Sequence, residues 1–255
     1  TRPTFDEILD GLRTNPDFIT ESVDKEDFYE YVNFLDNFNA TFDPGNRVQS
    51  LDDIRSRIHT FHDIRPRFFL KNIYQTEMND LMLDSDYLKF ANFESDKKIK
   101  NGKFYSVYKL IDPNTNTMYA EKTSRKAIDS FYKHEIINFS QELNGILQLN
   151  HPAILKCFAY KFVFFAEYSS PSIITEYASK GTLKDTIKPS VENDDKSLWN
   201  DTKKLISIYG IAAGMAYLHS HGILHRDLKP SNIYLDEYNF PKIAGFHLSI
   251  ELEDK

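Results

Sequence analysis

The sequence contains a single cysteine, Cys157, among its 255 residues. One thiol excludes an intrachain disulfide framework and a cysteine-based zinc site, and it is typical of proteins from a reducing compartment. No apolar run approaches the ~18 residues that a membrane-spanning helix needs, and no charged-then-apolar leader is present. We therefore expect a soluble, cytoplasmic protein without a membrane partner.

The chain also lacks a basic excess, because 38 Asp and Glu residues outnumber 31 Lys and Arg residues. Residues 1–90 carry most of this acidity, with 18 acidic and 10 basic side chains, whereas the remainder holds 20 and 21. Without surplus cations to neutralise phosphates, we expect no nucleic-acid partner. Hydrophobic residues make up 41% of the chain, which is enough for one or two packed domains.

Residues 1–90 show helical patterns and no catalytic constellation. Thr4, followed three residues later by Glu7, predicts a capping box at the start of a helix. A second helical period runs from Phe28 to Phe38, and a third begins after Ser50. The acidity of this all-α segment leaves open a role in binding a basic partner.

The pattern changes near residue 92, where strand signals begin. A long helix is predicted before His151-Pro152, and a strongly apolar helix from Leu205 to Leu218. Alternation and turn residues predict five strands, around residues 97–100, 106–111, 118–122, 155–165 and 172–177.

The most informative run is His225-Arg226-Asp227-Leu228-Lys229-Pro230-Ser231-Asn232. It supplies a carboxylate, a cation and an amide oxygen, which suit a general base, a phosphate clamp and a magnesium ligand. The run resembles the catalytic loop of the eukaryotic protein kinases, in its serine/threonine-specific form. The resemblance implies Asp227 and Lys229 as catalytic residues and Asn232 as a ligand of Mg²⁺.

The resemblance covers about residues 95–249 and is closest to the tyrosine-kinase-like group. It implies that Lys122 holds the phosphates of ATP and that Glu142 pairs with it, so both count as catalytic. Thr175 would lie at the back of the base pocket. The implied nucleotide-binding residues are Gly102, Val107, Ala120, Lys122, Thr175, Glu176 and Ala178.

The implied fold is α+β, with a protein-kinase-like arrangement of an antiparallel-sheet N-lobe and the start of a helical C-lobe, after an all-α segment. The activation segment and central helix of that lobe would follow Lys255, so we expect an incomplete C-lobe whose helix from Leu205 to Leu218 lacks part of its packing surface. The predicted regions are 1–20, similar to the tail of a preceding kinase C-lobe; 21–91, an acidic helical linker; 92–178, the N-lobe; and 179–255, the start of the C-lobe.

The glycine-rich loop departs from the family pattern. Only Gly102 remains, with Lys100 and Tyr105 at the other two glycine positions. Glycine is used there because backbone amides must approach the phosphates closely, so Tyr105 is expected to crowd that approach.

The magnesium motif departs as well. Gly245 replaces the metal-binding aspartate, and His247 replaces the glycine two residues later. Because Mg²⁺ favours carboxylate ligands, we expect weakened metal binding and a rate lower by about two or more orders of magnitude, unless Asp236 or Glu251 supplies the carboxylate.

Two functions follow from these observations. The first is a protein kinase that transfers the γ-phosphate of ATP to Ser or Thr hydroxyls of a protein substrate, with impaired activity. The alternative is a pseudokinase-like scaffold that binds a nucleotide or a protein partner without catalysis. A metal hydrolase using His221 and His225 is disfavoured, because no third ligand has a useful spacing.

Overall fold

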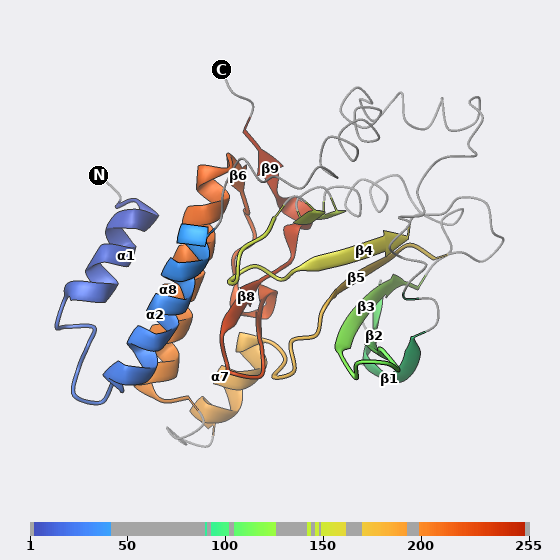
Figure 1. The fold of residues 1–255 in the computed structure, drawn as a ribbon, viewed down its shortest axis with the longest axis horizontal. Coiled ribbons are helices and arrows are strands. Elements are labelled where there is room, and N and C mark those ends of the chain that lie inside the picture. Colours follow the sequence, from blue (N-terminus) through green and yellow to red (C-terminus); the bar gives the residue numbers. More distant parts are fainter. Residues whose placement is uncertain are drawn as a thin grey trace.

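The computed structural model describes residues 3–41, 90, 93–101, 105–125, 142–143, 146–147, 149–161, 170–192 and 199–252. Gly102, the helix expected after Ser50 and most of the helix expected before His151 lie outside the described residues. The chain has the expected α+β architecture, with a sheet and a helical region side by side (Figure 1).

A five-stranded antiparallel sheet forms one lobe, with the order β1-β2-β3-β5-β4. All five predicted strands are confirmed, and the fourth is shorter than expected in its described part. Their bounds are β1 Glu94–Asn101, β2 Tyr105–Ile111, β3 Met118–Ser124, β4 Cys157–Lys161 and β5 Ser172–Glu176. Between β2 and β3 the chain reverses at Asp112, whose carboxylate accepts hydrogen bonds from Asn114 N and Thr115 Oγ1.

The second lobe is built on helix α8, Asp201–Ser220, which begins where Asn200 Oδ1 accepts a hydrogen bond from Lys203 N at 2.9 Å. Helix α7, Leu183–Glu192, precedes it. The chain then forms two small antiparallel pairs and two 3-10 turns. These are β6 Ile223–Leu224 with β9 Ile250–Glu251, β7 Ile233–Leu235 with β8 Pro241–Ile243, η4 Pro230–Asn232 and η5 Phe246–Leu248. The core between them is apolar and includes Ile154, Met215, Leu218, Ile233, Leu235, Ile243 and Phe246.

The N-terminal residues form helices α1, Phe5–Thr14, and α2, Lys25–Thr41. The predicted capping box is confirmed, since Thr4 Oγ1 accepts from Glu7 N at 3.2 Å and Thr4 N donates to Glu7 Oε2 at 2.7 Å. Both helices pack on α8 (Figure 1). The likeness of residues 1–20 to the tail of another lobe stays a prediction.

Helices α1 and α2 supply a packing surface for α8 that was not expected, although Ile208 of α8 stays 52% exposed. They bury one side of α8 in a second apolar core, which includes Leu12, Val23, Phe28, Tyr31, Val32, Leu35, Leu205, Ile206, Tyr209, Ala212 and Ala213. Polar contacts accompany this core: Arg13 donates to Tyr209 and to Asp36, and Ser22 Oγ donates to Asp201 Oδ2 at 2.6 Å. Burial of each large apolar side chain contributes roughly 1.5–3 kcal/mol, so the N-terminal helices stabilise the helical lobe.

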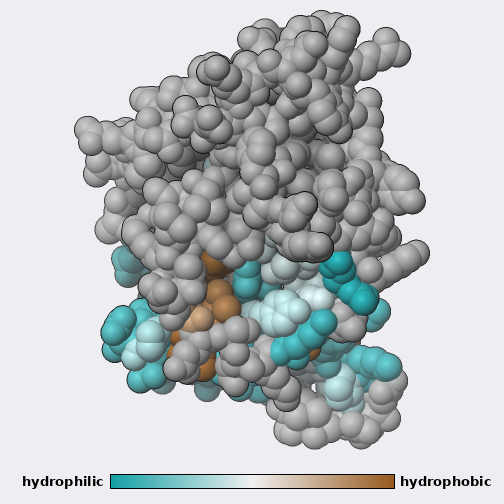
Figure 2. Space-filling view, turned by 90° about the vertical axis from the view of Figure 1, so that its right-hand side faces the viewer, coloured by the Kyte–Doolittle hydropathy of each residue, from teal (hydrophilic) through white to brown (hydrophobic). Residues whose placement is uncertain are grey.

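The described surface on the side of the sheet is mainly hydrophilic, with one narrow apolar strip (Figure 2). On β1 both Lys98 and Lys100 are exposed. Among the stretches that the structure describes, no helix is long and apolar enough to cross a membrane.

Candidate active site

Lys122 and Glu142 form an ion pair. Lys122 lies on β3, and its Nζ donates to Oε1 and Oε2 of Glu142 at 2.6 Å each. Glu142 is 8% exposed, whereas the Lys122 side chain keeps 31% of its surface. A two-oxygen contact with a buried carboxylate fixes the ammonium in place, which suits an amine that must hold phosphates.

Tyr105, the first residue of β2, lies against the same lysine. Lys122 Nζ sits over the Tyr105 ring, 4.5 Å from its centroid. The expected crowding at this position therefore takes a definite form, because the ring contacts the ammonium itself.

The predicted base-binding residues lie on adjacent strands. Val107 of β2 pairs with Lys122, and Ala120 of β3 pairs with Thr175 of β5. Thr175 is 9% exposed and donates its hydroxyl to the carbonyl of Glu176 at 3.1 Å. The sheet register thus brings these four side chains near one another; Gly102 is outside the described part of the chain.

Glu176 ties this end of the sheet to the helical lobe. Its Oε1 accepts from Lys156 N at 2.8 Å, and its Oε2 lies 3.1 Å from Lys242 Nζ on β8. Two residues later, the carbonyl of Ala178 accepts from Gly181 N at 3.3 Å. The segment after β5 is therefore anchored on both sides, and the Lys242 contact is one that the sequence pattern did not reveal.

The loop before η4 presents Asp227. Arg226 adopts a φ of 63°, which is uncommon for a non-glycine residue and is found often at active sites. His225 is 1% exposed; its Nδ1 accepts from Asp227 N at 3.2 Å, so its Nε2–H donates to Ala244 O at 3.0 Å. Burial lowers the pKa of His225 below its ordinary value, which keeps the ring in this neutral, loop-bracing form.

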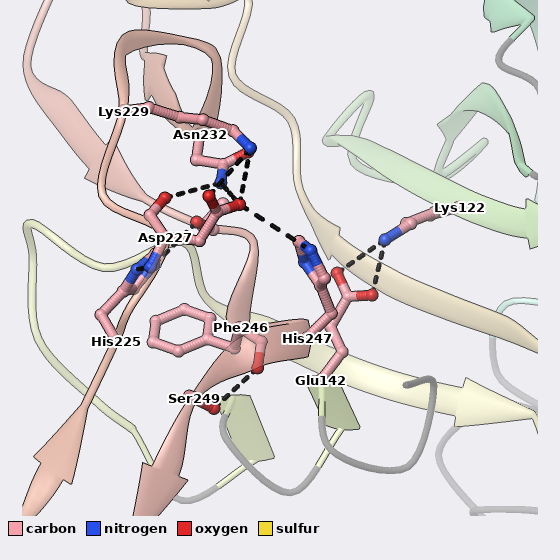
Figure 3. A network of polar contacts seen from close by, with 10 residues as sticks. Lys122, Glu142, His225, Asp227, Lys229, Asn232, Phe246, His247 and Ser249 are labelled. Atoms are coloured by element: carbon pink, nitrogen blue, oxygen red, sulfur yellow. Dashed lines mark hydrogen bonds and ion pairs between the residues drawn. The ribbon is translucent and has the colours of Figure 1, made fainter. Parts of the chain in front are cut away.

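Asp227 accepts hydrogen bonds from two other side chains of its loop, those of Lys229 and Asn232. Lys229 Nζ lies 2.9 Å from Oδ1 and 2.7 Å from Oδ2, and Asn232 Nδ2 donates to Oδ2 at 2.7 Å and to the Asp227 carbonyl at 2.9 Å (Figure 3). Burial raises the pKa of Asp227, but the hydrogen bonds from Lys229 and Asn232 outweigh it, so that pKa lies below its usual value. The carboxylate is therefore ionised at neutral pH and able to orient a donor.

His247 is a neighbour of Asp227 that sequence reasoning did not assign. Its Nε2 lies 3.8 Å from Asp227 Oδ2, and Figure 3 shows the ring pointing toward Asp227 on the side that faces Lys122 and Glu142. The sequence showed a histidine at a position where the family has glycine. It did not show where the His247 side chain points, because that direction depends on the turn at η5.

The residues present do not fit a magnesium site of the family type. Gly245 brings no oxygen, and Asn232 packs so closely on it that a Cβ at 245 would lie 2.7 Å from Asn232 Cγ. The Asp236 carboxylate is engaged elsewhere, because its Oδ1 accepts from Tyr238 N and Phe240 N within its own turn and its Oδ2 lies 3.9 Å from Lys242 Nζ. Across the described stretches, no group of three or more His, Cys, Asp or Glu side chains could hold a metal ion.

The comparisons with known proteins agree with this geometry. The sequence profile of the family described as "Protein kinase domain" matches residues 93–255. The chain therefore belongs to the eukaryotic protein kinase family.

Its relatives are protein kinases of several kinds. The serine/threonine-protein kinase RUNKEL of Arabidopsis thaliana is 31% identical over 159 residues, which cover 61% of this chain and 10% of that protein. An Aurora kinase of Candida glabrata is 30% identical over 169 residues, covering 64% and 42%. Calmodulin-binding receptor-like cytoplasmic kinase 2 of Arabidopsis thaliana is 27% identical over 214 residues, covering 83% and 50%. The chain thus spans between a tenth and a half of the length of these curated relatives.

Proposed function

We propose that this chain binds ATP between its two lobes and transfers the γ-phosphate to serine or threonine hydroxyls of a protein substrate. The observation that carries the proposal is the Asp227 carboxylate, held by Lys229 and Asn232, in one site with a lysine fixed by Glu142. Membership of the protein kinase family and the serine/threonine kinases among its relatives support this reaction class.

Each group has a role that its contacts permit. Lys122, held by Glu142, would bind the phosphates, and Asp227 would orient the substrate hydroxyl and accept its proton. The hydroxyl oxygen would bond to the γ-phosphorus while the bond from that phosphorus to the β–γ bridging oxygen breaks, leaving ADP. Lys229, whose side chain is 50% exposed, would neutralise the transferring phosphate.

The proposed transfer is slow. A metal ion contributes several kcal/mol to phosphoryl transfer, and each ~1.4 kcal/mol is a factor of ten in rate. Since Gly245 supplies no carboxylate, we expect a rate at least about a hundredfold below that of a member with one.

A second candidate function is a nucleotide- or partner-binding scaffold without catalysis. The contact between Gly245 and Asn232 favours it, because the space for a metal-binding side chain is filled by the amide. Only the kinase requires ATP against Lys122 and a substrate hydroxyl at Asp227, whereas the scaffold needs neither to bind a protein partner. The single Cys157 supports a reducing, cytoplasmic setting for either one.

The test is transfer of label from γ-³²P-ATP to a Ser/Thr peptide library, with separate analysis of labelled Ser and Thr. Asp227→Asn should reduce labelling to background, whereas Asp201→Asn, in an exposed ion pair with Lys204, should leave it unchanged. Equal labelling by the wild type and Asp227→Asn contradicts the proposal. If both proteins label only at background but the wild type binds ATP, the scaffold function is favoured.

A further inference from the structure

The ammonium of Lys122 is covered on two sides. Glu142 takes two of its hydrogen bonds, at 2.6 Å to each carboxylate oxygen. The ring of Tyr105 lies on another side, with its centroid 4.5 Å from Nζ. A lysine ammonium has only three donors, so Glu142 and the ring together restrict access to it, and the Lys122 side chain keeps 31% of its surface exposed.

The ring contact is attractive as well as space-filling. A cation over the face of an aromatic ring is stabilised by the ring quadrupole. A phosphate oxygen that binds Lys122 from the side of the ring therefore competes with this attraction. A glycine at this position presents neither obstacle, because it has no side chain.

We propose that Tyr105 is an affinity-determining residue of this site, which covers Lys122 and weakens the binding of the phosphate groups of a nucleotide but not of its base. This inference rests on the proposed binding of ATP between the lobes. The base would lie near Thr175 and Ala120, which pair with each other across β5 and β3. Tyr105 pairs with Ser124, four residues further along β3 than Ala120.

The experiment measures dissociation constants for ATP and for adenosine by calorimetry, in EDTA, on the full chain. Tyr105→Ala removes the ring, and Tyr105→Thr does so with a residue that favours strands. Tyr105→Phe keeps the ring. Tyr108→Ala is the matched control. Tyr108 lies on β2, as Tyr105 does, and its ring also lies under a lysine, with Lys98 Nζ of β1 at 5.6 Å from the ring centroid.

We expect Tyr105→Ala and Tyr105→Thr to bind ATP about two- to fivefold more tightly than the wild type, from the strength of an exposed cation–π contact. Tyr105→Phe and Tyr108→Ala should match the wild type, and adenosine affinity should be the same in every variant. Unchanged or weaker ATP binding by both ring-removing variants would overturn the inference, as would an equal gain for adenosine.

Phosphate transfer by the same samples separates this inference from the proposed function. Tighter ATP binding without transfer that depends on Asp227 would uphold the role of Tyr105 and defeat the kinase reaction. Transfer that depends on Asp227, together with an ATP affinity that does not change when Tyr105 is replaced, would uphold the kinase reaction and defeat the role of Tyr105.

Discussion

Restoring the family aspartate at position 245 is expected to destabilise the protein rather than repair its metal site. Gly245 has a φ of 85°, in the left-handed region where a side chain costs roughly 1–2 kcal/mol. The new Cβ would lie 2.7 Å from Asn232 Cγ and Nδ2, and forcing a side chain into a packed site costs about 1–3 kcal/mol. Gly245→Asp should therefore lower the free energy of unfolding by about 2–5 kcal/mol.

Urea denaturation of five proteins measures this effect: the wild type, Gly245→Asp, Gly222→Asp, Asn232→Ala and the double variant Gly245→Asp/Asn232→Ala. Gly222→Asp is the matched control, because Gly222 has a φ of 70° and, among the described residues, its Cβ would meet the Leu252 carbonyl oxygen at 3.6 Å, an ordinary contact. The backbone cost is therefore the one that applies there. Adding Asn232→Ala should recover about 1–3 kcal/mol of the Gly245→Asp loss through coupling at the shared contact. A Gly245→Asp protein as stable as the wild type, or strictly additive losses in the double variant, would refute this account.

Three further predictions concern the helical lobe. Phe28 is fully buried where α2 packs on α8, so Phe28→Ala should lower the free energy of unfolding by about 3–5 kcal/mol in urea denaturation. Phe18 is 48% exposed, so Phe18→Ala should change it by no more than about 0.5 kcal/mol. Equal losses would count against the packing of α2. Burial holds the pKa of His151 at about 4, below its usual 6.5, so the unfolded chain takes up the proton first as the pH falls. The free energy of unfolding should therefore be full above pH 6.5 and fall toward pH 4. Denaturation curves across that range should show a flatter pH dependence for His151→Gln. Tyr31→Phe should be at least as stable as the wild type by thermal unfolding, because within the described residues the buried Tyr31 hydroxyl has no hydrogen-bond partner; a loss above about 1 kcal/mol would reveal one.

Local patterns were sufficient for the five strands of the sheet and for the start of α1, but not for the short strands β6 to β9. The capping box at Thr4 and Glu7 and the strands of the sheet depend on neighbours a few residues away, where spacing fixes geometry. The same holds for the contacts of Asp227 with Lys229 and Asn232, two and five residues further along the chain.

Long-range packing could not be predicted from the sequence in the same way. Periodicity shows that a helix has an apolar face but not which element covers it, so the packing of α1 and α2 on α8 was missed. Arg13 and Tyr209, which meet in that interface, are 196 residues apart in sequence. The directions of the Tyr105 and His247 side chains likewise follow from the backbone around them, although their substitution for glycine was visible.

The most direct test of the site is ATP binding to Lys122→Met, measured by calorimetry. Lys204→Met is the control, because it alters an exposed lysine that forms a surface ion pair with Asp201. Lys122 fixed by Glu142 is predicted to hold the phosphates, so Lys122→Met should lose at least about tenfold in ATP affinity, equivalent to ~1.4 kcal/mol. Lys204→Met should bind as the wild type does. Wild-type affinity in Lys122→Met would contradict a nucleotide site between the lobes.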